Sequence, residues 1–354
     1  MKQNEKPTVA LIFGGRGFEH DVSVEGAKFM LPLIDTERFN PLPVLITKRG
    51  EWLTLPLSGD GNRKDTLSRR VTPIAGENTS APHGLCDLSC EFIPVDLAIP
   101  LLHGDHGEDG EISAVLESAG IPYVGCDVPS GAVAIDKVYT KILAKHLDIP
   151  IAPFRLLTLR GEPTDSDISE CESELGYPMF IKPARLGSSF GASSADDRLE
   201  LKHALREAHA TGEERILVEK KVQIFRELEC AYLSVPDQKE VYSIGEIRVG
   251  ASYDFNKKYL DTSSVTLNPR PDLPCEIRSN ILRYTKDLAA LIGVRDLSRF
   301  DFFEDSEGNI LFNELNTFPG FTASSMFPML MEVEGITNKE LISLLISAAL
   351  SRAK

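Results

Sequence analysis

Short apolar runs alternate with amphipathic segments along the first third of the chain. Three runs have the length of buried strands: Thr8–Phe13, Pro43–Thr47 and Leu97–Leu102. The first and third stop at glycine-containing turns. Apolar residues at helical spacing predict two helices, Ser23–Leu33, which begins at a good N-cap residue, and Ile112–Ala119. Strands that alternate with helices are typical of a parallel α/β layer.

The pattern changes twice further along the chain. The stretch 56–91 is polar and rich in Gly, Ser, Thr and Pro, which predicts a long loop or a decorated sheet edge. A second α/β unit begins near Asp127. Its predicted elements are a helix Asp136–Leu147, a strand Pro178–Lys182, a Gly/Ser loop Leu186–Ala192, a helix Asp197–Thr211 and a strand Ile216–Glu219.

The last part of the chain has an antiparallel pattern. One hairpin is predicted from Glu229–Ser234 and Val241–Val249. A second joins Phe300–Phe303 to Asn309–Asn313 around the turn residues Asp305–Gly308. Helices are predicted over Cys275–Ile292 and Asn338–Leu350.

Composition and charge narrow the class of protein. A length of 354 residues with 42% apolar and 26% charged residues predicts a globular protein of two or three domains. The 38 basic and 53 acidic residues give a net charge of −15, which disfavours nucleic acid and anionic lipid as partners. Residues 1–7 lack the pattern of a signal peptide, and no apolar stretch reaches the roughly 20 residues of a spanning helix. We therefore expect a soluble cytoplasmic protein with no membrane or nucleic-acid partner.

A lysine and a glycine-rich loop form a candidate phosphate site. Lys182 ends a predicted strand, and Gly187–Gly191 follows it. Glycines allow close backbone approach, while serine hydroxyls and free N–H groups donate to phosphate oxygens. The loop is not a Walker motif, which would place Gly-Lys-Ser/Thr at the start of a helix. A plain strand–turn–helix connection is the alternative.

Oxygen-bearing side chains on the second predicted hairpin form a candidate metal site. Asp301 lies on its first strand, and Glu314 and Asn316 follow two residues apart on the next, so the latter two face the same way. Two carboxylates and an amide oxygen suit Mg²⁺. Solvent-facing residues of a hairpin are the alternative, but Arg299 shares the face of Asp301 and phenylalanines flank the cluster, which favours a cleft wall.

Two loops follow predicted strands, where α/β proteins place ligands. One contains His103 and His106 within 103–110, and the other contains Glu19-His20. The histidine pair lacks the spacing of a helical zinc motif. Loops that satisfy their own hydrogen bonds are the alternative for both.

Taken together, these features resemble the D-alanine–D-alanine ligase family of the ATP-grasp superfamily. The resemblance covers nearly the whole chain outside about 56–91. Its matching runs are Ile12–Gly15 with Glu19–Ser23, His103-Gly104 with Gly107–Gly110, Gly120–Gly125, Asp136-Lys137, Phe180–Ala184 with Gly187–Ser189, Leu217–Glu219, Lys258-Tyr259, Arg299–Asp301 and Asn313–Thr322.

The resemblance implies an α/β protein with a three-domain ATP-grasp architecture. The domains would be an N-terminal parallel α/β domain over 1–125, a central ATP-grasp domain over 126–223 and a C-terminal ATP-grasp domain over 224–354. ATP would bind between the second and third domains. Its implied ligands are Lys137, Lys182, Ser189, Glu219, Glu227 and Lys258. Two Mg²⁺ ions, for which Mn²⁺ can substitute, would be held by Asp301, Glu314 and Asn316.

The resemblance also implies where the amino acids react. Glu19 would anchor the ammonium of the first substrate, with His103 nearby. Arg299 and the backbone N–H of Gly320 would stabilise an oxyanion. Ser325 and Met326 would border the second subsite, and Tyr259 would hydrogen-bond to Ser188 and Glu19 to close the loop over the intermediate.

The implied activity is ATP-dependent ligation of two D-alanines for peptidoglycan precursors. The resemblance also implies a homodimer. D-serine or D-lactate as the second substrate, another ATP-grasp carboxylate–amine ligase and a nucleotide-sensing regulator are the alternatives. The loop Ser252–Tyr259 has no histidine, unlike D-lactate-forming relatives, which favours an amine. The chain departs from the family pattern at Gly17, at Glu111–Ala114 and at Asp296, where glycine is common, and it has Arg185 in common with some resistance ligases.

Overall fold

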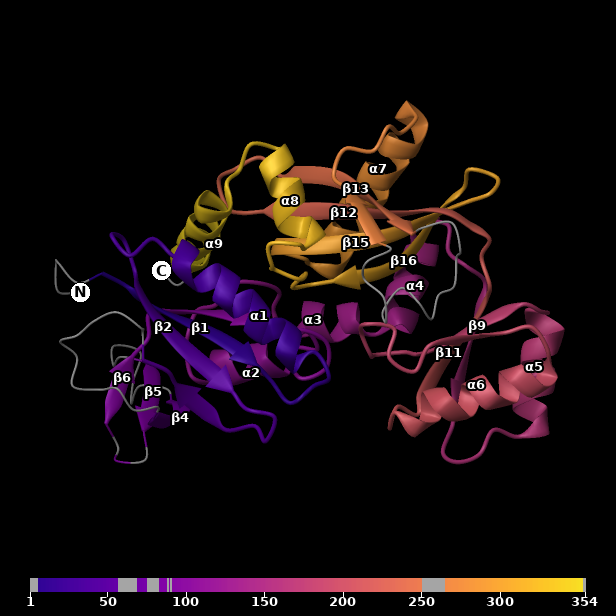
Figure 1. Cartoon of the computed structure of the whole chain (residues 1–354), viewed down its shortest axis with the longest axis horizontal. Helices are drawn as coiled ribbons and strands as arrows, with labels where there is room; N and C mark the ends of the chain where they lie inside the picture. The colour runs from indigo at the N-terminus through magenta and orange to yellow at the C-terminus, as the bar shows by residue number, and fades with distance from the viewer. Residues whose placement is uncertain are drawn as a thin grey trace.

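Three sheets form the framework of the molecule. The computed structural model describes residues 6–56, 69–74, 83–87, 89, 91–249 and 265–352. The N-terminal sheet lies at the left of Figure 1, the middle sheet at the lower right, and the C-terminal sheet above and between them. The strand orders are β6-β5-β4-β3-β2-β1-β7, β10-β9-β11-β8 and β14-β13-β12-β15-β16.

The N-terminal sheet has a parallel centre, as predicted. β1 (Thr8–Gly14) pairs in parallel with β2 (Asn40–Ile46) and β7 (Leu97–Leu101). Alternate residues of β1 face opposite sides of the sheet. One side packs on α1 (His20–Met30), which continues into the 3₁₀ turn η1 (Leu31–Leu33), and the other packs on α2 (Glu111–Ser118).

Part of the polar stretch 56–91 belongs to this sheet. Four short strands extend it in antiparallel fashion: β3 (Trp52–Thr54), β4 (Arg69–Ile74), β5 (Gly84–Asp87) and β6 (Phe92–Pro94). The loop alternative is therefore wrong for residues 69–74 and 84–87, and the decorated edge is correct. Short strands with few buried residues give a weak apolar pattern, which is why the sequence did not separate the two.

The first helix begins three residues earlier than predicted. Ser23 is not its N-cap but lies inside α1, fully buried. Its hydroxyl accepts a hydrogen bond from Gly14 N (2.8 Å) and donates to the carbonyl of Leu101. Ser23 thus ties the carboxyl ends of β1 and β7 together, which a pattern of local capping residues cannot reveal.

The middle sheet is antiparallel and carries two helices. Its strands are β8 (Phe154–Thr158), β9 (Met179–Pro183), β10 (Ser193–Ala195) and β11 (Arg215–Lys220). The helices are α5 (Asp165–Glu174) and α6 (Arg198–Ala210), which share one apolar core with the sheet. Asp197 caps α6 by accepting hydrogen bonds from the N–H groups of Leu199 and Glu200, so the predicted start of this helix is confirmed.

Two helices precede the middle sheet where one was predicted. α3 (Val128–Ile135) ends at Asp136, and α4 (Lys137–His146) begins there. The Asp136 carboxylate accepts hydrogen bonds from the N–H groups of Val138 and Tyr139. This cap fixes the position of Lys137 at the first residue of α4.

The C-terminal sheet confirms both predicted hairpins. Its strands are β12 (Ile224–Ser234), β13 (Val241–Val249), β14 (Val265–Asn268), β15 (Asp296–Asp305) and β16 (Ile310–Asn316). Its helices are α7 (Cys275–Ile292), α8 (Met326–Val333) and α9 (Asn338–Arg352). The register of β15 and β16 pairs Asp301 with Glu314 and Arg299 with Asn316.

The end of the chain packs back onto the N-terminal sheet. Residues of α8 and α9 share a core with β1, β7 and α1 (Figure 1). The guanidinium of Arg352 donates to both carboxylate oxygens of Asp296 (2.7 and 2.6 Å) and to the carbonyl of Tyr123 (3.2 Å). Asp296 also accepts a hydrogen bond from Gly125 N (2.7 Å). An aspartate therefore stands at this usual glycine position because it joins three segments of the chain.

Within the part of the chain that the structure describes, no helix has both the length and the apolar character needed to cross a bilayer. The division of the chain at residues 125 and 223 stays a prediction.

The contacts of Asp296 generate a prediction on stability. Asp296 is fully buried, so Asp296→Asn would leave Arg352 without its carboxylate partner. We expect the free energy of unfolding in urea to fall by about 2–4 kcal/mol, less than the roughly 3–5 kcal/mol of fully buried pairs, because the Arg352 side chain is partly exposed. Asp237→Asn is the matched control, because Asp237 also has a positive φ (60°, against 63°) but is exposed in a turn. Equal losses in the two variants would contradict the prediction.

Candidate functional site

Predicted site residues line two cavities, and the larger one lies between the middle and C-terminal sheets. It has about 920 Å³ of empty space, including the open space at its mouth. Its walls come from β9, the loop 186–192, the end of β11 and the strand β16. Polar residues on these walls include Lys137, Lys182, Ser189, Glu219, Asn313 and Glu314. Phe180 and Phe190 add apolar surface that suits a flat ring.

A buried carboxylate holds two lysines at the back of this cleft. Glu219 Oε1 lies 2.7 Å from Lys141 Nζ, and Glu219 Oε2 lies 2.8 Å from Lys182 Nζ. Burial would raise the pKa of the Glu219 carboxyl, but the two ammonium groups outweigh it and lower the pKa to about 2. Burial lowers the pKa of Lys141, and Glu219 limits that decrease. Each oxygen of the Glu219 carboxylate therefore contacts one lysine.

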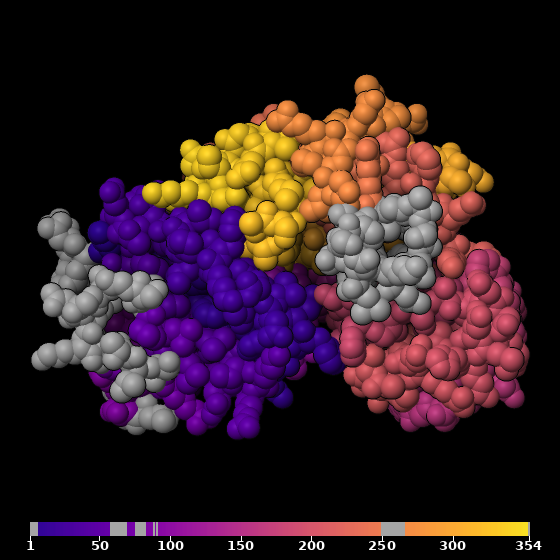
Figure 2. Space-filling view, in the orientation of Figure 1, coloured from indigo at the N-terminus to yellow at the C-terminus, as the bar shows by residue number. Residues whose placement is uncertain are grey.

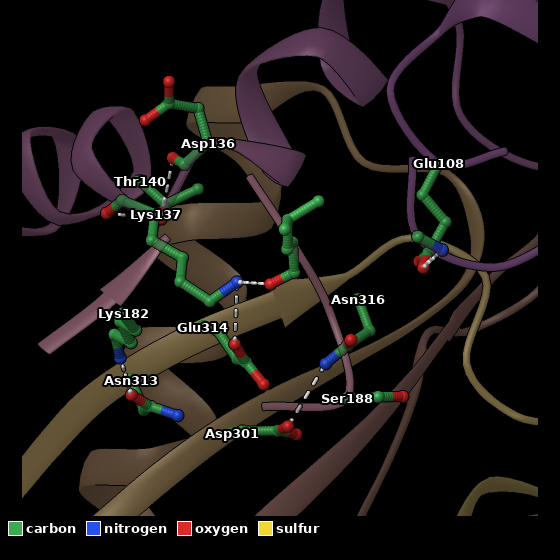
Figure 3. A network of polar contacts seen from close by, with 12 residues as sticks. Glu108, Asp136, Lys137, Thr140, Lys182, Ser188, Asp301, Asn313, Glu314 and Asn316 are labelled. Carbon is green, nitrogen blue, oxygen red and sulfur yellow. Dashed lines mark hydrogen bonds and ion pairs between the residues drawn. The ribbon is translucent and has the colours of Figure 1, made fainter. Parts of the chain in front are cut away.

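Two lysines of the cleft also reach the C-terminal sheet (Figure 3). Lys182 Nζ donates to Asn313 Oδ1 (3.0 Å). Lys137 Nζ donates to the carbonyl of Leu186 (2.8 Å) and lies 3.3 Å from Glu314 Oε2. Both ammonium groups face the cleft from the side of the glycine-rich loop, so both can contact a phosphate placed there.

The glycine-rich loop has a strained and open backbone. Ser188 and Ser189 have φ values of 47° and 52°, and Gly191 has 71°. Left-handed backbone at two serines is unfavourable unless surrounding contacts hold it. Such a conformation also turns successive N–H groups toward one side, which is the arrangement that binds anions.

The predicted metal residues lie together on β15 and β16. Arg299 donates to both oxygens of Asp301 (2.7 Å each), and Asn316 Nδ2 donates to Asp301 Oδ2 (3.1 Å; Figure 3). Arg299 Nε also lies 3.3 Å from Glu229 Oε1. Burial would lower the pKa of Arg299, but Asp301 and Glu229 outweigh it and raise the pKa above its ordinary range. Burial alone would raise the pKa of the Glu314 carboxyl, but the cations Lys137, Lys182 and Arg299 outweigh burial and lower this pKa.

This donor set fits magnesium. The neighbouring cations lower the pKa of the Glu314 carboxyl, and together with the carboxylate of Asp301 and the amide of Asn316 it offers the hard oxygen ligands that Mg²⁺ prefers. Their present partners are side-chain cations, Lys137 and Arg299, so the site already favours positive charge at these oxygens.

A second, smaller cavity adjoins the large cleft. It has about 420 Å³ of empty space, and Glu19, Gly104, Glu108, Ser188, Asn316 and Thr317 are among its walls. Ser188 donates a hydrogen bond to Glu19 Oε1 (2.5 Å). Burial and the nearby Glu314 raise the pKa of Glu19, although the hydrogen bond from Ser188 opposes them. Lys137, Gly187 and Glu314 line both cavities, so the two spaces meet at these residues.

The loop after β7 holds the backbone of one residue of the C-terminal part, Phe318, through both its N–H and its carbonyl. His103 Nδ1 donates to the carbonyl of Phe318 (3.0 Å), and Glu108 accepts from Phe318 N (2.9 Å) and from Gly104 N (3.0 Å). Burial lowers the pKa of His103 to about 4 and raises the pKa of Glu108 to about 7. Among the described residues, none hydrogen-bonds to His103 Nε2. The Nδ1–H tautomer follows from the carbonyl partner.

The two histidines of this loop do different things. His106 lies on the outer side, with its Nδ1 2.5 Å from Glu111 Oε2 and its backbone N–H bonded to Asp109. Ligand atoms of His106, Asp109 and Glu111 lie within 4.8 Å of one another, whereas His103 points to Phe318. A shared zinc site of His103 and His106 has no support in this geometry.

The remaining predicted residues are placed less uniformly. Glu227 is buried on β12 opposite Phe303, which lines the large cleft. Ser325 Oγ accepts from Thr322 N (3.0 Å) and holds the turn that follows Gly320. Met326 is 3% exposed and packs against Gly245 of β13 in the apolar core, and its place at the border of the second subsite stays a prediction. Lys258 and Tyr259, with the whole run 252–259, lie outside the described residues.

Two residues of the site were missed by the sequence reasoning. Glu108 lies inside the run Gly107–Gly110, whose position after a strand was a usable signal. Lys141 follows Lys137 by one helical turn, but nothing local indicates that its ammonium is buried against Glu219.

Comparisons with known proteins agree on one family. Models described as "D-ala D-ala ligase N-terminus" and "D-ala D-ala ligase C-terminus" match residues 8–126 and 143–347. The D-alanine–D-alanine ligase of Caldicellulosiruptor bescii is 38% identical, over 98% of this chain and 96% of the relative. Two solved structures are each 30% identical. The VanG D-Ala:D-Ser ligase of Enterococcus faecalis has a TM-score of 0.84, over 98% of this chain and 100% of that chain. D-alanyl-alanine synthetase A of Vibrio cholerae has a TM-score of 0.83, over 98% and 99%.

The buried His103 generates a prediction on pH. Its pKa is about 4 in the folded chain and ordinarily 6.5, so below pH 6.5 the unfolded chain binds a proton that the folded chain does not. Lowering the pH from 6.5 to 4 should therefore destabilise the protein through this group by up to about 3 kcal/mol.

The measurement is the free energy of unfolding at both pH values in wild type and His103→Gln. We expect the variant to lose less stability on acidification than the wild type. His203→Gln, on the exposed face of α6, is the control and should behave as wild type. The same pH dependence in all three proteins would show that His103 is not held neutral by the fold.

Proposed function

The chain belongs to the D-alanine–D-alanine ligase family, and from this membership we propose that it joins two D-alanines to D-alanyl-D-alanine with conversion of ATP to ADP and phosphate. The observation that carries the proposal is the meeting of the two cavities at Lys137, Gly187 and Glu314. A nucleotide phosphate in the large cleft and an amino-acid carboxylate in the small cavity would come into contact at that point. Phosphoryl transfer depends mainly on such positioning and on charge stabilisation.

The large cleft is the proposed ATP site. Lys137, Lys182 and the N–H groups of the loop with Ser189 would hold the phosphates. Both oxygens of Glu219 are engaged by lysines, so its proposed role is to position Lys182, while the backbone of the residues after it meets adenine. Lys220, Lys221 and Val222 line the cleft there. Glu227 is the proposed ribose ligand, and Lys258 is assigned to the transferring phosphate by family resemblance alone.

Asp301, Glu314 and Asn316 are the proposed ligands of two Mg²⁺ ions. Bound magnesium would supply positive charge to the phosphate oxygens during transfer. The chain's own part is to present ionised carboxylates, since Lys137, Lys182 and Arg299 keep the pKa of Glu314 low before any ion binds.

The reaction would proceed through an acyl phosphate. Glu19 would hold the ammonium of the first D-alanine, with His103 nearby. A carboxylate oxygen of this D-alanine would then attack the terminal phosphorus of ATP as ADP leaves. The amine of the second D-alanine would then attack the carbonyl carbon. Arg299 and the Gly320 N–H are the proposed donors to the resulting oxyanion, a role for which one donor is typically worth about 10²–10³ in turnover. Phosphate leaves with the electrons of the broken C–O bond.

The second subsite decides the product. Ser325, next to the Gly320 turn, and the neighbouring Met326 stay the proposed borders of that subsite. D-alanine is the proposed second substrate. D-serine is the second candidate, because the chain is as similar to a D-Ala:D-Ser ligase as to a D-alanyl-alanine synthetase. D-lactate is less favoured because the run 252–259 has no histidine.

The wider setting follows from the reaction. We propose that the dipeptide serves peptidoglycan precursors, that the protein acts in the cytoplasm, where ATP is supplied, and that it is a homodimer. Loss of metal ligands would be tolerated in a nucleotide sensor without turnover, and this chain retains Asp301, Glu314 and Asn316.

The metal assignment makes a prediction on magnesium dependence. Glu314→Gln should raise the Mg²⁺ concentration for half-maximal activity at least about tenfold, because even supporting residues of metal sites change affinity by 10–100-fold. The measurement is phosphate release against Mg²⁺ at saturating ATP and D-alanine. Glu307→Gln, in the exposed turn that precedes the strand of Glu314, is the control. Wild-type magnesium dependence in Glu314→Gln would remove Glu314 as a ligand.

The product assignment is tested by competition. The wild type receives ATP, Mg²⁺ and equal concentrations of D-alanine and D-lactate, then D-alanine and D-serine, at pH 6 and pH 8. We expect D-alanyl-D-alanine to predominate in mass spectra of both mixtures at both pH values, since no loop histidine favours an anionic hydroxy acid. Predominant depsipeptide would refute the amine assignment, and predominant D-alanyl-D-serine would establish the second candidate.

A further inference from the structure

Two exposed phenylalanines stack on each other across the mouth of the site. The rings of Phe18 and Phe190 have centroids 4.0 Å apart and planes at 25°. Phe18 is 62% exposed and Phe190 is 41% exposed. Phe18 belongs to the loop after β1, and Phe190 to the loop after β9 in the middle part. In Figure 2 indigo and pink atoms, which are these two parts of the chain, meet at the lower middle of the molecule.

The stack lies where the two cavities join. Phe190 lines the large cleft, and Phe18 directly precedes Glu19, which lines the small cavity. The hydrogen bond from Ser188 to Glu19 joins the same two loops. Gly187 lies so close that a Cβ there would be 2.8 Å from Glu19 Oε2. The contact between the loops is therefore one hydrogen bond, one close backbone approach and one aromatic stack.

The first loop is a fixed support for this contact. A Cβ at Gly17 would lie 2.6 Å from Asp105 Oδ1, so the backbone before Phe18 sits directly on the loop after β7. This closeness also fits the glycine at position 17, where the chain departs from the family pattern. Phe18 thus follows a backbone position that the loop after β7 holds, and its ring stacks on Phe190.

The other loop needs such a support. Ser188 and Ser189 both adopt left-handed backbone, with φ of 47° and 52°. Non-glycine residues keep this conformation only where neighbouring contacts hold it. Phe190 follows these two serines immediately, so its stacking on Phe18 opposes relaxation of the strained turn.

We propose that the Phe18–Phe190 stack is a latch that holds loop 187–191 over the junction of the two cavities and keeps water from the acyl phosphate; this rests on the proposed ligase function. Phe18 and Phe190 are positioning residues, since neither reacts. With the latch open, a water oxygen attacks the carbonyl carbon of the acyl phosphate. The C–O bond to phosphate breaks, phosphate leaves with its electron pair, and the water loses a proton to solvent. D-alanine and phosphate result, and ATP is consumed without dipeptide.

The expected effect is moderate. An aromatic pair of this kind changes an equilibrium on the order of 2- to 12-fold. Phe190→Ala and Phe18→Ala should each raise the excess of phosphate released over dipeptide formed by that factor, and should raise the KM of the first D-alanine. Because both variants open one latch, the double variant should match the single variants. Phe190→Tyr, which keeps a stacking ring, should restore the wild-type ratio.

The experiment measures phosphate and D-alanyl-D-alanine in the same reaction, with ATP, Mg²⁺ and D-alanine. Phe225→Ala is the matched control, because Phe225 is 63% exposed and the guanidinium of the adjacent Arg226 lies over its ring. Its ratio should equal that of the wild type. Melting temperatures show whether each variant is folded.

The outcomes separate the two proposals. A wild type that forms no dipeptide overturns the proposed function. A wild type that forms dipeptide and phosphate in equal amounts, with alanine variants that keep this ratio and an unchanged KM, overturns the latch alone. Losses that multiply in the double variant also overturn it, because they would show that the two rings act independently.

Discussion

The carboxylate of Glu219, buried with the ammonium groups of Lys141 and Lys182, is the interaction on which the site depends. Each charge alone would be costly in the interior, and a buried pair adds little net stability compared with well-packed apolar residues. Its effect is positional. Lys182 comes from β9, Lys141 from α4 and Glu219 from β11, so the triad joins three elements at one point. The hydrogen bond of Lys182 to Asn313 then ties that point to β16 of the C-terminal sheet.

The other charged groups of the site form ion pairs in which bound phosphate or metal ions could replace one partner. Lys137 lies against Glu314, and Arg299 lies against Asp301. A phosphate would attract the cations, and metal ions would attract the carboxylates, so both kinds of group could change partners with little movement. Charges fixed in advance need no reorganisation during reaction, which is the main source of electrostatic catalysis. The net charge of the whole chain is −15, but it does not describe the local charge of this cleft, where lysines are concentrated.

Sequence patterns predicted the elements well wherever local chemistry decides them. The α7 boundaries, the Asp197 cap and the register that pairs Asp301 with Glu314 follow from helical periodicity, capping and turn residues. The misses come from contacts between distant segments. The sequence pattern makes Ser23 a cap, because its bond to Leu101 cannot be seen from neighbouring residues. Residue types and spacing alone predict Lys182 and the set Asp301, Glu314 and Asn316, and family resemblance adds Lys137 and Glu219. The buried Lys141 and the stacked phenylalanines needed the fold.

The backbone of Phe318 shows why the N-terminal part cannot be separated from the chemistry of the C-terminal part. Its carbonyl accepts from His103 and its N–H donates to Glu108, so both backbone polar groups of this residue are held by a loop of another sheet. Phe318 stands between Asn316, a proposed metal ligand, and Gly320, a proposed oxyanion donor. Glu108 also lines the small cavity beside Glu19. The same loop therefore shapes the pocket for the first amino acid and sets the strand end from which the proposed metal and oxyanion groups project, so a displacement at one must be transmitted to the other.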